Sequence, residues 1–178
     1  SDADVDRHLG LATNLLPAVD DIKVFVAKGA RVKAVVVRGA GTLAASFDLL
    51  DAGGIACLRV EAVNPGAWGN SLRITVTDDP SDAVNFFKLA VAYSPQLNLA
   101  ESYDHCGMDG SSRYNVEYLV NDVSNLVKVT RLTANRPANG ASTALLGGLD
   151  GSAPPSSQYL AAYAYFSSDE ELTHMSFE

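Results

Sequence analysis

The chain has 178 residues, of which 47% are hydrophobic and 19% charged, and its 13 Lys and Arg against 21 Asp and Glu give a net charge of -8. This is typical of a globular protein long enough to bury a core without disulfides or metals. The acidic balance disfavours nucleic-acid binding, which needs phosphate neutralisation, and the longest apolar run, residues 159–166, is too short to cross a bilayer.

The N-terminal part is expected to lead into the fold. Residues 1–16 begin polar and acidic, which predicts a tail without an export signal. Pro17 suits the first position of a helix, and apolar residues then recur at helical spacing, so a helix is expected over 17–28. A β-branched run predicts a buried strand over 31–38. Residues 17–42 are therefore predicted to form a helix and a strand that precede the main β-rich domain.

Residues 43–100 are predicted to form a β-rich domain. Apolar and polar residues alternate over 43–50, 55–63, 71–76 and 87–93, which is the pattern of half-buried strands. Gly53 and Gly54 separate the first two runs and indicate a hairpin. An antiparallel sheet or sandwich is expected from these short strands and the turn residues between them.

Residues 101–178 are predicted to form an α/β portion that is truncated at its C-terminal end. After a polar loop we expect a helix over 113–123, a strand over 126–132, an irregular crossing over 133–157, a helix ending near 166 and a strand over 172–177. The last helix should face inward through Tyr159, Leu160, Tyr163 and Phe166. Strands 31–38, 125–132 and 172–177 would share a sheet, and the fold class is α+β with a sandwich-like antiparallel portion.

A glycine-rich segment, Gly39 to Ala44, fits the pattern G-x-G-x-x-A of dinucleotide-binding loops. Such a loop would hold a pyrophosphate on a helix beginning at Thr42, with Glu61 placed to bind a ribose. However, the alternation over 43–50 predicts a strand at that place. The nucleotide-binding enzyme is therefore kept as an alternative, which a helix over 42–50 would support.

Other chemical groups are better explained as structural. Side chains of residues adjacent in sequence point apart, whereas a nucleophile, its base and an orienting acid must converge. The polar loop at 104–112 is therefore not predicted to be catalytic. The acidic turn around Pro80 lacks the spacing of a calcium loop and is expected to be solvated. The two cysteines are expected to be reduced thiols. The groups explained in this way are Asp104, His105, Cys106, Ser111 and Ser112; His8 and His174; Asp78, Asp79 and Asp82; Cys57; and the aromatic residues near 159–166.

Two loops carry a family resemblance. Residues 59–76 read as a strand, a Pro-Gly-x-Trp-Gly-Asn turn and a second strand, and residues 145–151 read Leu-Leu-Gly-Gly-Leu-Asp-Gly before a helix. In this order, the two loops resemble those of the contractile tail sheath proteins of phages and related injection machines. The helix and strand near 22–38, the segment 101–104 and the helix near 114–124 extend the resemblance over about residues 20–170. The family-motif residues are Pro65, Gly66, Trp68, Gly69, Asn70, Gly147, Gly148, Asp150 and Gly151.

The resemblance implies a structural function. Sheath subunits stack in hexameric rings around an inner tube and contract, so the expected partners are other sheath subunits and the tube, in a virion tail or an assembled contractile particle made in the bacterial cytoplasm. No enzyme activity, cofactor, metal, nucleic acid or membrane is implied. The family is usually longer, so the chain would be a central portion. A soluble adhesion module remains a further alternative. Replacing a buried Trp68 by Ala should cost roughly 3 to 5 kcal/mol, and an effect near zero would indicate an interface.

Overall fold

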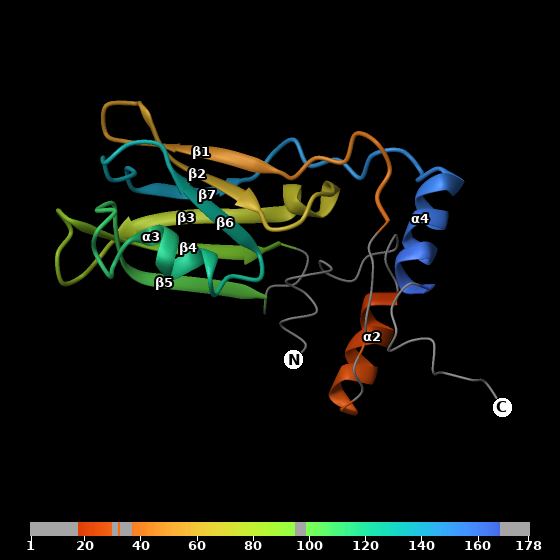
Figure 1. The fold of residues 1–178 in the computed structure, drawn as a ribbon. Helices are drawn as coiled ribbons and strands as arrows, with labels where there is room; N and C mark the ends of the chain where they lie inside the picture. Colours follow the sequence, from red (N-terminus) through yellow and green to blue (C-terminus); the bar gives the residue numbers. More distant parts are fainter. Residues whose placement is uncertain (1–17, 30–31, 33–36, 95–98, 168–178) are drawn as a thin grey trace.

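The computed structural model describes residues 18–29, 32, 37–94 and 99–167. Within these residues the chain forms two antiparallel sheets and three α-helices, which confirms the predicted α+β class (Figure 1). The helices are α2 (Ala18–Ala27), α3 (Val116–Asn121) and α4 (Ser156–Ser167). α2 and α4 lie beyond one end of the sheets, whereas α3 lies beside them.

The first sheet has the strand order β1–β2–β6, with β1 at Ser46–Leu50, β2 at Ala56–Ala62 and β6 at Val127–Arg131. β1 and β2 form the predicted antiparallel hairpin. Its turn is fixed by Asp51, whose carboxylate accepts hydrogen bonds from the N–H groups of Gly53 and Ile55, both at 2.9 Å. A short acceptor side chain at this position stabilises the turn locally.

The second sheet has the order β5–β4–β3–β7. Its strands are β3 (Leu72–Asp78), β4 (Phe86–Tyr93), β5 (Ala100–Gly107) and β7 (Gly140–Ala144). The 3-10 helix η1 (Ala67–Ser71) carries the chain from β2 of the first sheet into β3 of the second. The segment that connects the two sheets therefore contains the Trp-Gly-Asn motif.

The core lies between the two sheets. Apolar residues that alternate along the strands point inward from both and form one buried cluster, as predicted for a sandwich. The largest fully buried side chains include Phe87 and Leu89 of β4, Leu58 of β2 and Ile74 of β3. Cys57 and Cys106 are buried in the same cluster as free thiols, as expected.

Segments from the C-terminal half cover both open sides of the sandwich. On one side, the backbone around β7 bridges to the first sheet, where Leu146 pairs with Ser46 and Pro137 with Asp51. On the other side, α3 packs on β6 and also contacts β5. Both sides of the sandwich are therefore partly covered by segments of the same chain.

Two predictions for the C-terminal half were wrong because local composition concealed strands. The polar loop before α3 contains β5, an edge strand whose exposed side chains are polar because they face solvent. The irregular crossing over 133–157 contains β7, a strand of small residues held by its pairing with β3. α3 is shorter than predicted, because turns precede its N-cap, Asn115, whose side chain accepts from Glu117 N–H at 2.7 Å.

The predicted sheet of 31–38, 125–132 and 172–177 is corrected for its middle strand. β6 pairs with β2 on one edge, and side chains from residues 117–124 bond the N–H groups on its other edge. In α4, Tyr159 and Leu160 are 54% and 68% exposed and do not face inward. The strand over 172–177, residues 31 and 33–36 of the predicted strand 31–38, the lead-in 1–16, Pro17 and the side chains of Tyr163 and Phe166 lie outside the described residues.

Candidate functional site: a clasp between two glycine loops

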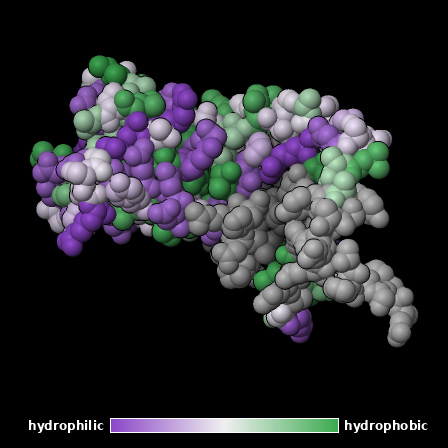
Figure 2. All heavy atoms as spheres, in the orientation of Figure 1, coloured by the Kyte–Doolittle hydropathy of each residue, from purple (hydrophilic) through white to green (hydrophobic). Residues whose placement is uncertain are grey.

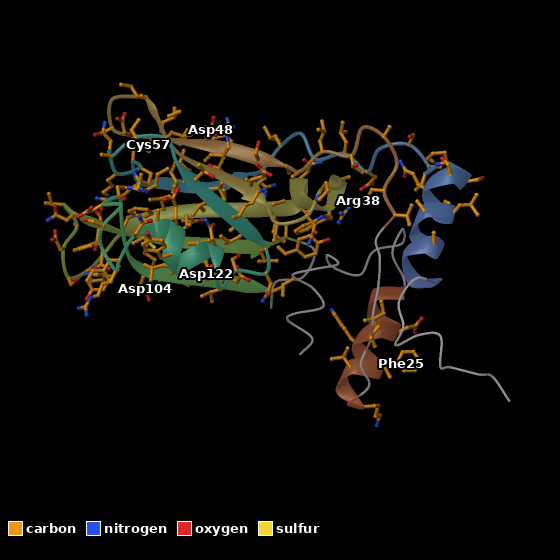
Figure 3. The ribbon with its side chains drawn as sticks, viewed as in Figure 1. Phe25, Arg38, Asp48, Cys57, Asp104 and Asp122 are labelled. Atoms are coloured by element: carbon orange, nitrogen blue, oxygen red, sulfur yellow. The ribbon has the colours of Figure 1, made fainter. Side chains whose placement is uncertain are left out.

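The two loops that carry the family resemblance lie against each other. The first runs from Asn64 to Asn70 and includes all of η1 except its last residue, and the second is residues 146–151; we call their contact the clasp. The clasp lies at the end of the sandwich where Figure 3 labels Arg38, whose guanidinium donates to Asn64 Oδ1 at 3.2 Å. Segments about 80 residues apart in sequence are thus brought together.

Side chains of one loop pair with the backbone of the other. Asn70 Nδ2 donates to Gly148 O at 2.9 Å, and Gly148 N–H donates to Asn70 Oδ1 at 2.8 Å. The Asn70 amide therefore satisfies both backbone groups of Gly148, as a neighbouring strand would. In the opposite direction, Asp150 Oδ1 accepts from Ala67 N–H at 2.8 Å.

The clasp requires glycine at its closest approach. A Cβ atom on Gly148 would lie 2.4 Å from Gly66 O, a distance that backbone cannot relieve by a rotamer change. Gly66 itself has a φ of 136°, a conformation that other L-residues rarely adopt. Glycine on both sides therefore allows the two backbones to touch.

A third segment runs between the two loops. Leu43 O accepts from Gly66 N–H at 3.0 Å and from Leu149 N–H at 2.9 Å, and Leu43 N–H donates to Leu149 O at 3.0 Å. Leu43 thereby joins three parts of the chain by backbone hydrogen bonds alone. Sequence reasoning did not find this role, because backbone pairing leaves no signature in residue type.

The dinucleotide alternative for Gly39 to Ala44 was wrong. Thr42 opens no helix, and the chain instead continues into β1. A Cβ on Gly39 would lie 1.7 Å from Ser152 O, and Ser152 N–H donates to Ala40 O at 3.0 Å, so backbone occupies the space above this loop. Glu61, the expected ribose ligand, pairs with Lys128 at 2.8 Å.

Trp68 anchors η1 on the core. Its ring is half-buried, packs against the core cluster and meets the Tyr93 ring edge-on, with centroids 6.3 Å apart and an interplanar angle of 62°. This geometry is favourable for aromatic pairs. The loss of roughly 3 to 5 kcal/mol expected for Trp68→Ala requires a buried ring, and this ring is only half-buried.

His105 contacts a different loop from the one that the sequence suggested. In β5, Asp104 and His105 lie opposite the single residue Lys88, which makes a β-bulge, and His105 has a φ of 57°. Its ring stacks on Phe86 at 3.8 Å between centroids, and its Nδ1 lies 3.2 Å from both Asp79 Oδ2 and Ser81 Oγ.

The Asp79, Ser81 and His105 group does not have the geometry of a catalytic triad. A triad places the serine and the carboxylate on different imidazole nitrogens, so that a proton can move between them. Here both approach Nδ1, and Ser81 Oγ donates to Asp79 Oδ1 at 2.5 Å. Hydrogen bonds from the Ser81 hydroxyl and N–H, followed by contact with His105, lower the pKa of Asp79 to about 2.

The remaining candidates are held in local structural contacts. Asp78 pairs with Arg136 at 2.7 Å, and Asp104 pairs with Lys88 at 2.9 Å. Asp82 accepts from Asn85, which closes the turn before β4. The Cys106 thiol donates to Tyr103 O, the Ser111 hydroxyl donates to Asp109 Oδ1, and the Ser112 hydroxyl accepts from Tyr114 N–H. His8 and His174 lie outside the described residues. Among the described residues, no group of three or more His, Cys, Asp or Glu could hold a metal ion.

A cavity of about 680 Å³ opens at the other end of the sandwich, near the labelled Asp104 in Figure 3. Phe86, Met108, Arg131 and Arg136 contribute to its lining. Both guanidinium groups are paired with carboxylates, Arg131 with Glu117 at 2.9 Å and Arg136 with Asp78. Their charge is therefore balanced, which makes the cavity a poor anion site.

No helix in the part of the chain that the structure describes is long and apolar enough to span a membrane. On the face shown in Figure 2, hydrophilic residues are interspersed with scattered apolar ones.

The clasp should contribute measurably to stability. We expect Asn70→Ala to lower the free energy of unfolding by about 1 to 2 kcal/mol, because two partly buried hydrogen bonds are lost, and Asp150→Ala to lower it by about 0.5 to 1 kcal/mol. In a double-mutant cycle measured by urea unfolding, the two effects should be non-additive, since both residues join the same loops. Gln158→Ala, an exposed amide on α4, is the control; strict additivity would contradict a cooperative clasp.

Trp68→Ala should destabilise the fold by about 2 to 3 kcal/mol, less than for a fully buried ring, because part of the indole is already in solvent. Chemical unfolding followed by circular dichroism measures this. Trp68→Phe retains a ring against Tyr93 and should lose less than half as much. A negligible change on Trp68→Ala would mean that the indole serves a partner instead of the core.

Acid should weaken the β3–β4 loop, in which the Ser81 hydroxyl and N–H bond the Asp79 carboxylate, and with it the contact of the loop with β5. The folded pKa of Asp79 is about 2, below the ordinary 3.8, so its contribution is present above about pH 4 and is lost as the pH falls toward 2. Asp79→Asn should remove this part of the pH dependence of the unfolding free energy. Asp104→Asn, which changes an exposed aspartate, should leave this pH dependence unchanged. If the unfolding free energies of the wild type and of Asp79→Asn fell equally with decreasing pH, the role assigned to Asp79 would be contradicted.

No protein-family model matches the sequence, and no curated protein matches it. Among solved structures, the chain is similar to the sheath tail protein of Desulfitobacterium hafniense, with 15% identity, a TM-score of 0.47 and coverage of 74% of this chain and 30% of that one. It is also similar to the sheath tail protein of Listeria innocua, with 18% identity, a TM-score of 0.49 and coverage of 74% and 29%.

The chain thus spans about 30% of the length of the sheath tail proteins that it matches.

Proposed function

We propose that this chain is a structural portion of a contractile tail sheath subunit. The observation that carries the proposal is the clasp. The sequence resemblance rests on two short motifs about 80 residues apart, and their polar residues, Asn70 and Asp150, bond each motif to the other. Two motifs that form one structural unit support the resemblance more strongly than two turns that form independently.

The closed sandwich suits a subunit that moves as a rigid body. Contraction exchanges one set of contacts between subunits for another, so each subunit must keep its internal packing while its neighbours shift. Here one core joins both sheets, and the chain covers both sides of the sandwich. The proposed partners are copies of the sheath subunit, in hexameric rings, and the inner tube of a virion tail or injection machine.

The proposed role is not catalytic. Asp79 and Ser81 meet the same nitrogen of His105, which is unsuited to proton relay, and backbone fills the space above the Gly39 loop. The features that could have indicated an enzyme therefore have structural explanations.

Immunogold electron microscopy tests the location. Antibodies raised against the purified chain are applied to contractile particles released by the cells that encode it. Label should repeat along the whole outer wall of extended tails and follow the wall as it shortens on contraction. Antibodies against the inner tube protein, which should label only the exposed tube, are the control. Label confined to the tip or the head, or absent from the tails, would overturn the proposal.

A further inference from the structure

β6 is an end strand of its sheet, and alternate backbone groups along it point away from β2. Val63 N–H donates to Leu126 O, and Leu132 N–H donates to Cys57 O, so the even-numbered residues face β2. The N–H groups of Val127, Val129 and Arg131 therefore face the open edge. An edge of this kind is a ready template for pairing with another chain.

Each of these three N–H groups has a side-chain acceptor from α3 or the turn that follows it. Val127 N–H donates to Ser124 Oγ at 2.9 Å, Val129 N–H to Asn121 Oδ1 at 2.7 Å, and Arg131 N–H to Glu117 Oε1 at 2.9 Å. Asn121 Nδ2 also donates to Val129 O at 3.0 Å. At Val129, one side chain supplies both bonds that a paired strand would make.

The spacing of the three acceptors matches the strand. Glu117, Asn121 and Ser124 follow each other by four and three residues, which places them on one side of a helical segment. Four helical residues rise about 6 Å, and two strand residues rise about 6.6 Å, so the acceptors advance in step with alternate residues of β6. The segment thus replaces an antiparallel strand with side chains.

The segment is also fixed in place. Val116 and Val120 are fully buried in the core, and Glu117 Oε2 pairs with Arg131 Nε at 2.9 Å. Ser124 Oγ donates to Glu101 Oε2 on β5 at 2.5 Å, which ties the segment to the second sheet as well. Figure 1 shows α3 beside β6 and β5.

We infer that residues 116–124 are an edge guard, which prevents β6 from pairing with β6 of a second copy of this chain. A second copy is a suitable occupant because β6 alternates valine with polar residues. Antiparallel pairing of two such strands centred on Val129 sets Lys128 against Thr130 and Val127 against Arg131, so no like charges face each other. The guard directs association of subunits to other surfaces.

The test opens the edge in the full chain with Asn121→Ala and Glu117→Ala together. The variant should form dimers or larger species as its concentration rises, measured by light scattering after size exclusion. In the low-concentration monomer, amide exchange at Val129 should be at least about tenfold faster than in the wild type, while Lys128, which bonds to β2, changes less. The single variant Asn121→Ala is measured in the same way and decides the outcome if the double variant does not fold.

Two controls separate the guard from general destabilisation. Glu117→Gln retains an oxygen acceptor for Arg131 N–H but not the charge, and Tyr118→Ala changes an exposed side chain of α3; both should keep the association state of the wild type. A folded variant that stays monomeric while its Val129 amide exchanges rapidly would overturn the inference. So would self-association of Tyr118→Ala to the same extent.

Discussion

The structure depends on satisfying the backbone groups at the edges of two small sheets. A sandwich of three and four strands leaves four outer edges, and an unpaired N–H or C=O that loses water costs free energy. This chain meets the constraint with segments that are not regular strands. On the β1 side, Leu149 pairs with Leu43 and Leu146 pairs with Ser46, and on the β6 side Asn121 supplies both bonds for Val129.

Asparagine has the same role at two distant places. Asn70 bonds both backbone groups of Gly148, and Asn121 bonds both backbone groups of Val129. A side-chain amide carries a donor and an acceptor with the spacing of a peptide group, so it can end a sheet without a further strand. Both residues lie where the chain passes from one sheet to the other. Asn70 joins η1 to the loop at Gly148, and Asn121 joins α3 to β6.

The sequence predicted strands well where side chains alternate between core and solvent, as in β2, β3 and β4, and helices where apolar spacing and caps agree, as in α2. It did not predict strands that are recognisable only from the strand with which they pair. β5 faces solvent with polar side chains, and β7 consists of small residues, so only their pairing with β4 and β3 identifies them.

The clasp was predictable only in part. Its motif residues were found from their resemblance to a family, but nothing local indicated that Asn70 would reach Gly148 or that Asp150 would reach Ala67. The spacing of Glu117, Asn121 and Ser124 carried no signal of a partner strand, since polar residues on the helix side opposite a buried face normally lie in solvent. The contact of His105 with Asp79 had no signal either, because it follows from a bulge.

That bulge has a consequence for how the chain can vary. At His105 the backbone adopts a left-handed conformation, which is unfavourable for a residue with a Cβ, and the stacked Phe86 ring and the Asp79 carboxylate offset the strain. Glycine or asparagine would relieve the backbone but abandon those contacts. Sequence drift at this position is therefore coupled to drift at positions 79 and 86, and the three residues should change together or not at all.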